Sequence, residues 1–181
     1  MPVVHIKRLC PSASQILDKT EHTHYSKKLM QACSLPAHVR HFPGSNPVSI
    51  ERKELERLRD GDFMASLKTD GVRHLLLLTT KPNSTDPVAL MIDRTMGMYE
   101  VEIWGNEDFF YKGSVFDGEL AWENNEQLVY IIFDVVMSAG QKCINMTYRD
   151  RLKMIHNTIL CVSNIHDDES IERMIVEESK I

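Results

Sequence analysis

The feature that most constrains the fold is a series of short apolar segments in the middle of the chain. Segments of this length, rich in β-branched and aromatic residues, are typical of strands. The sequences TDG, KPNSTDP and ENNE between them contain residues that favour turns. The expected strands are 63–69, 73–80, 88–92, 98–104, 114–121 and 128–136. The last two, joined by ENNE, are expected to form an antiparallel hairpin.

Helical patterns precede this region. Residues 11–35 are polar with a loose apolar period and predict one or two helices. Residues 36–48 carry three prolines and a glycine, which predicts an extended connector. The stretch SIERKELERLRDG then predicts a helix that Ser49 caps and Gly61 ends, with leucines along one edge.

Helical patterns also follow the strands. Four apolar residues recur at a spacing that places them on one face of a helix: Tyr148, Leu152, Ile155 and Ile159. Residues 167–180 predict a second helix. Strands followed by helices, without β-α-β alternation, indicate an α+β fold with a largely antiparallel sheet and flanking helices. We expect an N-terminal helical and extended segment, 1–41, and a second domain, 42–181.

Composition excludes some classes of function. The chain has 181 residues and a net charge of -5, which argues against a protein that coats nucleic acid through a broad basic face. Brief contact with one RNA end stays compatible with this charge. Apolar runs fall well short of the ~20 residues of a membrane span, and the N-terminus lacks a signal-peptide pattern. The four scattered cysteines indicate reduced thiols inside a cell.

One lysine, Lys68, interrupts the apolar segment FMASLKTDGVRHLLLL (63–78). The common explanation is a stem that packs while the ammonium group reaches solvent. The alternative is a nucleophile, which must be neutral, whereas roughly one lysine in a thousand is neutral near pH 7. Partial burial beside another cation, such as a divalent metal, would lower the lysine pKa and favour the nucleophile.

The residues after Lys68 suit a phosphorylated ligand. Along a strand, the side chain of Asp70 would point to the same face as the side chain of Lys68. Gly71 would let the chain turn close to a ligand, and the guanidinium of Arg73 could bind phosphate or sugar oxygens. On its own, however, K-x-D-G is weak evidence, because a chance match occurs in roughly one chain of this size in twenty.

Taken with further stretches, KTDGVR resembles the first motif of the covalent nucleotidyltransferases, which include mRNA capping guanylyltransferases and ATP-dependent DNA and RNA ligases. The stretches that resemble the capping branch, in the family's order, are FPGSNPVSIERKEL (42–55), MIDRTMGMY (91–99), GSVFDGEL (113–120) and YIIFDVV (130–136). The resemblance runs from about residue 42 to residue 136. It implies a nucleotidyltransferase (ATP-grasp-like) lobe.

This resemblance implies mRNA guanylyltransferase chemistry. Lys68 would attack the α-phosphorus of GTP, expel pyrophosphate and become a lysyl-GMP phosphoramidate. The GMP would then pass to the 5′-diphosphate end of a nascent RNA. A divalent cation, magnesium or manganese, would compensate the charge of the leaving pyrophosphate. The choice of guanine over adenine follows from the family branch alone.

The resemblance also implies roles for other residues. Arg73 and Arg94 would contact ribose or phosphate, and Phe133 would stack on the guanine. Glu119 would help to hold the ribose and the metal–nucleotide complex. From the residues alone, Glu119 could instead face solvent and Phe133 could be plain core. Further residues expected to bind the nucleotide or to shape the loops are Thr69, Asp70, Gly71, Asp117 and Gly118.

The chain departs from the capping pattern after residue 136. Capping enzymes continue with an acidic-glycine strand that holds a metal, a K-x-K strand that grips the α-phosphate, and an OB-fold lid. Residues 137–181 match neither motif, so we expect an incomplete lobe with little activity of its own. A fragment of an ATP-dependent polynucleotide ligase and a non-catalytic, partner-binding fragment stay open as alternatives.

The resemblance further implies a cellular setting. Expected partners are GTP, the RNA end, an RNA triphosphatase and the tail of RNA polymerase II, with no membrane. The expected location is the nucleus, or a cytoplasmic factory if the chain is viral.

Overall fold

A computed structural model describes most of the chain between residues 3 and 162. The described residues are 3–5, 15–46, 49–61, 63–64, 70–101, 103, 105–123 and 127–162. Of the expected strand 63–69, residues 63 and 64 lie outside any strand and the rest falls outside the described residues. The expected helix 167–180 also falls outside them.

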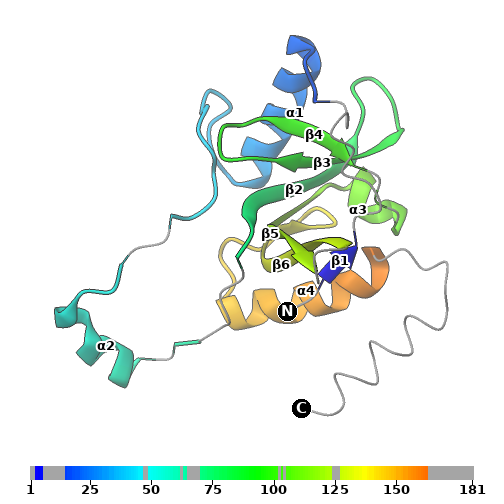
Figure 1. Cartoon of the computed structure of the whole chain (residues 1–181). Helices are drawn as coiled ribbons and strands as arrows, with labels where there is room; N and C mark the ends of the chain where they lie inside the picture. The colour runs from blue at the N-terminus through cyan, green and yellow to red at the C-terminus, as the bar shows by residue number, and fades with distance from the viewer. Residues whose placement is uncertain are drawn as a thin grey trace.

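An antiparallel sheet forms the centre of the molecule (Figure 1). Its spatial order is β1-β6-β5-β2-β3-β4, and β7 pairs with β6. The strands are β1 (Val3–His5), β2 (Val72–Thr80), β3 (Pro87–Ile92), β4 (Met98–Val101), β5 (Ser114–Glu123), β6 (Gln127–Ser138) and β7 (Gln141–Lys142). Every pairing between these strands is antiparallel, which confirms the α+β prediction.

Turn chemistry accounts for the β2–β3 hairpin. Asn83 adopts a positive φ of 55°, which asparagine tolerates better than most residues. The backbone N–H of Lys81 donates to the Asp86 carbonyl at 2.9 Å, and the Asp86 N–H donates to Ser84 Oγ at 2.9 Å. Strand β4, in contrast, is shorter than expected, because Ile103 lies outside it.

The described helices are α1 (Lys19–Ala32), the 3-10 helix η1 (Arg52–Glu54), α2 (Leu55–Asp60), α3 (Glu107–Tyr111) and α4 (Tyr148–Val162). The prediction that Ser49 caps the second of these was wrong, because Glu51 occupies that position. The Glu54 side chain accepts a hydrogen bond from the Glu51 N–H at 3.2 Å. This carboxylate therefore satisfies a backbone donor at the N-terminal end of η1. Gly61 ends α2 as expected.

The leucine run of β2 is apolar throughout because helices cover both faces of the sheet. Leu76 and Leu78 are buried in a cluster that includes residues of α3 and α4: Phe109, Phe110 and Ile155. Leu75 and Leu77 are buried in a second cluster on the other face, which includes residues of α1: Tyr25, Leu29 and Met30. Alternate side chains of one strand therefore build two cores.

The N-terminal residues join this same architecture. Strand β1 pairs with β6, and α1 packs against the sheet, although both precede residue 42. The division of the chain at residue 41 stays a prediction.

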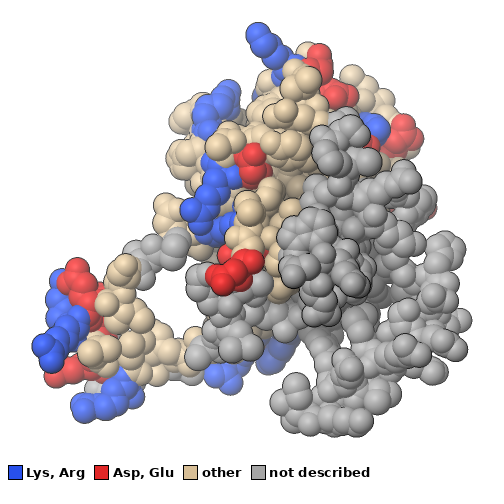
Figure 2. Space-filling view, viewed as in Figure 1, with Lys and Arg blue, Asp and Glu red and all other residues tan. Residues whose placement is uncertain are grey.

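The segment with η1 and α2 projects away from the sheet (Figure 1). Leu55 and Leu58, which were expected to form its apolar edge, are 53% and 37% exposed. Figure 2 shows charged side chains on the outer side of this segment and uncharged ones on the side that faces the sheet. None of the described helices has both the length and the apolar composition needed to cross a bilayer.

Candidate nucleotide site

The candidate site lies where β2 begins beside β5. The register pairs Val72 with Leu120 and Arg73 with Glu119, so it brings the KTDGVR and FDGEL stretches side by side. Residues directly opposite each other in an antiparallel pair project to the same face, so Arg73 and Glu119 share a face. The β5–β6 pairing that the sequence predicted is confirmed.

Lys68 and Thr69 lie outside the described residues. The proximity of Lys68 to Glu119 therefore stays a prediction.

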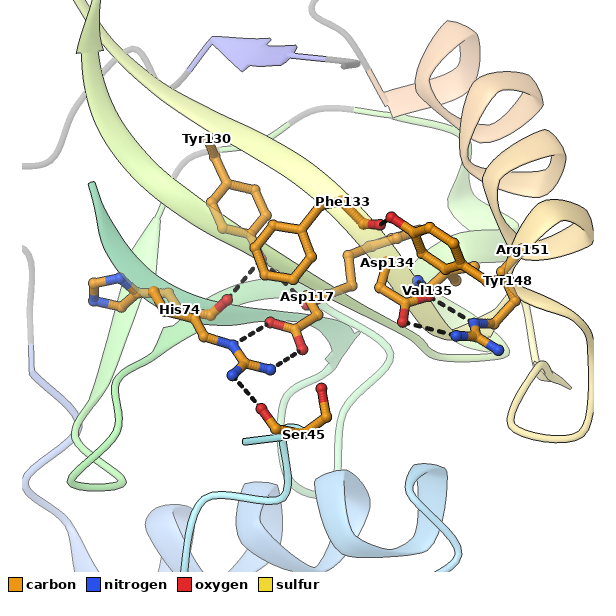
Figure 3. Close-up of polar contacts among 11 residues, drawn as sticks. Ser45, His74, Asp117, Tyr130, Phe133, Asp134, Val135, Tyr148 and Arg151 are labelled. Atoms are coloured by element: carbon orange, nitrogen blue, oxygen red, sulfur yellow. Dashed lines mark hydrogen bonds and ion pairs between the residues drawn. The ribbon is translucent and has the colours of Figure 1, made fainter. Parts of the chain in front are cut away.

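A buried ion pair between Arg73 and Asp117 is the main polar contact of this region (Figure 3). The Arg73 Nε donates to Asp117 Oδ1 at 2.9 Å, and Nη2 donates to Oδ2 at 2.5 Å. The two side chains are only 9% and 7% exposed. Such a bidentate arrangement fixes the plane of the guanidinium. A third donor, Nη1, reaches the Ser45 carbonyl oxygen.

This pairing corrects one expectation. Asp117 and Gly118 were expected to shape loops, but both lie within strand β5. Asp117 pairs with Leu75 of β2 and with Asp134 of β6, so it lies between two neighbouring strands. Its buried carboxylate therefore needs a polar or charged partner.

Burial and charge act in opposite directions on the Asp117 carboxyl group. Burial raises its pKa above the ordinary value, and the Arg73 guanidinium lowers it without cancelling that effect. The hydrogen bond from Arg73 to Asp117 raises the Arg73 pKa in turn, against the opposing effect of burial. An arginine stays protonated in any case, so the pair is charged on at least one side at every ordinary pH.

Two aromatic rings enclose the Arg73 guanidinium. Its central carbon lies 5.4 Å from the centroid of Phe42 and 5.7 Å from that of Phe133. A cation at this distance from a ring is attracted by it. Phe42 and Ser45 belong to the connector before η1, so Arg73 ties this connector to the sheet. Sequence reasoning missed Phe42 as a contact, because nothing local links it to Arg73.

Phe133 lies at a β-bulge of β6. Ile132 pairs with Gly118 and Asp134 pairs with Asp117, so Phe133 is the extra residue between them. A bulge bends the strand and re-aims a side chain. Phe133 is half-buried, its ring lies against the Arg73 guanidinium, and it belongs to neither described core cluster.

Gly118 and Tyr130 allow the strands to pack closely at this β-bulge. A Cβ at Gly118 would lie 2.4 Å from the Ile131 carbonyl oxygen and 2.7 Å from the Tyr130 ring. The buried Tyr130 hydroxyl donates to the His74 carbonyl at 2.8 Å and to the Phe116 carbonyl at 3.2 Å. It thereby joins β6 to backbone groups of β2 and β5.

A second bidentate ion pair joins the bulge to α4. Arg151 Nε donates to Asp134 Oδ1 at 2.6 Å, and Nη2 donates to Oδ2 at 3.0 Å (Figure 3). The Tyr148 hydroxyl donates to the Phe133 carbonyl at 3.0 Å. Sequence reasoning missed these contacts as well, because they join residues 15 or 17 positions apart on different elements.

A surface hollow of about 580 Å³ borders the bulge. It is lined by Phe63, Met64 and the start of α4, including Tyr148, which also contacts the Phe133 carbonyl. The chain just before the KTDG stretch therefore passes the N-terminal end of α4.

The other predicted residues lie around the same end of the sheet. A Cβ at Gly71 would lie 2.5 Å from the Leu120 carbonyl oxygen, so the glycine permits a close approach to β5. Asp70 is exposed. Arg94 is exposed in the turn after β3. The β2–β3 pairing ends at Leu75 and Ile92, so this turn lies at the Arg73 end of the sheet.

The donor set gives limited support for a metal. Within the ranges that the structure describes, no three histidine, cysteine, aspartate or glutamate side chains gather as a metal-binding group. Asp117 is held by Arg73, so Glu119 is the partly accessible carboxylate opposite Arg73. Magnesium and manganese prefer several oxygen ligands, and one carboxylate is only part of such a set.

The known proteins to which this chain is similar are mRNA capping enzymes. The family model described as mRNA capping enzyme, catalytic domain, matches residues 8–179. The chain is similar to the mRNA-capping enzyme subunit alpha of Schizosaccharomyces pombe, with 32% identity over 61% of this chain and 29% of the relative. It is also similar to the subunit alpha of Saccharomyces cerevisiae, with 29% identity over 65% of this chain and 30% of the relative.

A mammalian relative shows the same pattern. The mRNA-capping enzyme of Mus musculus is 28% identical over 66% of this chain and 20% of its own length. The chain thus spans less than a third of each of these relatives. The family model, in contrast, covers nearly all of its residues. The chain therefore belongs to the mRNA capping enzyme family, whose catalytic-domain model it matches over residues 8–179.

Proposed function

We propose that the chain is part of an mRNA guanylyltransferase that transfers GMP from GTP, through a lysyl-GMP intermediate at Lys68, to the 5′-diphosphate end of RNA. The observation that carries this proposal is the β2–β5 register. It pairs Arg73 of KTDGVR with Glu119 of FDGEL on one face of the sheet, directly after the lysine motif. Family membership supports the same activity.

The proposed reaction has two steps at phosphorus. In the first, the neutral Lys68 amine forms a P–N bond to the α-phosphorus of GTP, the bond to pyrophosphate breaks and the amine loses a proton. In the second, a terminal oxygen of the RNA diphosphate attacks the same phosphorus. The P–N bond then breaks and the amine regains its proton. A bound magnesium or manganese ion would supply charge compensation for pyrophosphate, with Glu119 as one of its ligands.

Arg73 has a double role in this proposal. Three of its five N–H donors bind Asp117 and Ser45, which leaves two donors for a ribose or phosphate oxygen. The ion pair and the rings of Phe42 and Phe133 hold the guanidinium in place before any ligand binds. Such preorganisation avoids an entropic cost during the reaction.

Phe133 and Arg94 complete the proposed nucleotide contacts. The bulge directs Phe133 out of the core, which suits a ring that stacks on guanine. The guanidinium of Arg73 lies against the same ring, so one face of the Phe133 ring would contact Arg73 and the other would stack on the guanine base. Arg94, exposed at the same end of the sheet, would bind ribose or phosphate.

The biological setting follows from the proposed activity. An enzyme that caps nascent mRNA would work in the nucleus, or in a cytoplasmic factory if the chain is viral. An RNA triphosphatase would supply its diphosphate substrate, and the tail of RNA polymerase II would bring it to the transcript.

The test is covalent labelling of a form of the protein that includes the later capping motifs. Incubation with labelled GTP and a divalent metal should yield an adduct that is labile to acid and stable to alkali. Peptide mass spectrometry should place the GMP on Lys68. Lys68→Ala should abolish the adduct, and Lys68→Arg should fail too, because a guanidinium stays protonated and cannot attack.

Lys81→Ala provides the matched control. Lys81 is a half-exposed lysine at the far end of β2, paired with Glu100 at 3.2 Å, and its loss should leave labelling unchanged. Normal labelling of Lys68→Ala would refute the assignment of the nucleophile. Labelling with ATP in place of GTP would refute the guanylyltransferase proposal and favour a polynucleotide ligase.

A further inference from the structure

A second cavity lies on the sheet face of Arg73 but at the other end of β2. Its volume is about 250 Å³. Leu77 and Thr79, which line it, have the same strand parity as Arg73. At about 3.3 Å per residue, Thr79 lies roughly 20 Å along β2 from Arg73. This cavity is therefore separate from the candidate nucleotide site.

Among the residues that the structure describes, three lysines and no carboxylate line the cavity. Lys28 comes from α1, Lys112 follows α3, and Lys142 ends β7. Gln31 and Tyr111 add further polar groups to the lining. The whole chain carries a net charge of -5, whereas the charged residues among those described around this cavity are all lysines. Such a cavity attracts anions.

Two of the lysines are held in place by hydrogen bonds. Lys142 Nζ donates to Ser34 Oγ at 3.1 Å, which is a neutral partner and leaves the ammonium charge uncompensated. Lys112 Nζ donates to Asp108 Oδ2 at 2.8 Å, at the exposed outer side of α3. Lys28 is exposed on α1. The cavity therefore combines one neutralised lysine with two whose charge can act on a ligand.

The backbone brings these lysines together from distant parts of the chain. Gly113 and Gly140 both line the cavity and both adopt positive φ angles, 82° and 80°. The Gly140 N–H donates to the Gly113 carbonyl at 2.8 Å. This bond joins the residue after Lys112 to the turn just before β7, so Lys112 and Lys142 are held beside one cavity.

We propose that this cavity binds a phosphate group. The ammonium groups of Lys28 and Lys142 can donate to the oxygens of a multiply charged anion, and lysine binds phosphate as a point charge. The volume corresponds to roughly eight water molecules, which suits a phosphate or diphosphate rather than a nucleotide. The phosphate comes from one of two sources, a free inorganic anion or the backbone of an RNA strand.

The experiment measures binding of two probes to the 181-residue chain by calorimetry at low ionic strength. One probe is inorganic pyrophosphate, and the other is a short single-stranded RNA without a 5′-phosphate. The double variant Lys28→Gln with Lys142→Gln should bind its probe about tenfold more weakly, because two charge-assisted contacts are lost. Amide NMR shifts on titration should include those of Gly113 and Gly140.

The matched control is the double variant Lys27→Gln with Lys153→Gln. It removes the same charge from the same chain, but both lysines are exposed and neither lines the cavity. This control should bind like the unmodified chain. Thermal unfolding of both variants checks that each is folded.

The outcomes separate cleanly. Saturable pyrophosphate binding that depends on Lys28 and Lys142 assigns the cavity to a free anion, and RNA binding with the same dependence assigns it to a nucleic-acid phosphate. An equal loss in the control variant would show a general charge effect and overturn the proposal. Absence of saturable binding to both probes would overturn it too. None of these readouts involves Lys68 labelling, so the guanylyltransferase proposal is tested independently.

Discussion

Removing the Asp117 carboxylate should destabilise the fold strongly. Asp117→Asn keeps the shape of the side chain but leaves the Arg73 guanidinium without its counter-charge. The Arg73 side chain is only 9% exposed, and arginine cannot lose its proton to escape the penalty. Breaking a buried pair from one side costs about 3–5 kcal/mol. Because the amide keeps one acceptor, we expect about 3 kcal/mol, which lowers the melting temperature by roughly 6–12 °C.

Arg73→Met should behave differently as the pH changes. The carboxyl group that remains can take up a proton, unlike a guanidinium. Burial already raises the pKa of Asp117, and removal of Arg73 removes the main opposing effect. The folded variant then binds this proton at a higher pH than the unfolded chain does. The stability that this carboxyl group contributes is therefore fully present below the unfolded pKa of about 3.9 and is lost as pH rises through the raised folded value.

The assay is urea unfolding of both variants and of the unmodified chain at pH 7.5 and pH 5. The loss of free energy of unfolding in Arg73→Met should shrink at pH 5, whereas the loss in Asp117→Asn should not. Asp134→Asn is the matched control, since Asp134 and Arg151 form the same bidentate pair at 26% and 20% exposure. It should cost about 1 kcal/mol. A cost for Asp117→Asn no larger than this, or losses independent of pH in Arg73→Met, would refute the reasoning.

Two further substitutions test the geometry around the site. Gly71→Ala should destabilise the chain by about 1–2 kcal/mol in urea unfolding, because its Cβ would lie 2.5 Å from the Leu120 carbonyl oxygen and the backbone must shift; unchanged stability would show that this approach relaxes freely. Tyr130→Phe should cost about 1–2 kcal/mol in thermal unfolding, because the buried hydroxyl donates to backbone carbonyls of two neighbouring strands; a neutral result would show that water satisfies those carbonyls.

Local patterns in the sequence were enough to predict the elements nearest the site. The apolar run of β2, the turn residues before β3 and the β5–β6 hairpin depend on neighbours along the chain, and the structure confirms each of them. The periodic residues after Tyr148 likewise predicted α4. Chain-local effects such as strand parity and turn geometry act within a few residues, so they can be read without tertiary information.

Patterns in the sequence did not predict the shortest strands and helix. Strands β1 and β7 have three and two residues, and α3 has five, too few for a periodic signal. Their formation depends on the partners that the rest of the fold supplies, such as β6 for both short strands.

The sequence by itself determined the order of the longer strands and helices, and it singled out Arg73, Asp117, Glu119 and Phe133 as residues of interest. Only the tertiary structure decided that Asp117 is the buried partner of Arg73, and that a bulge turns Phe133 toward the same guanidinium. The physical reason is that these contacts join residues 44 and 60 positions apart on different strands. Their geometry is set by register and desolvation, which no local pattern encodes.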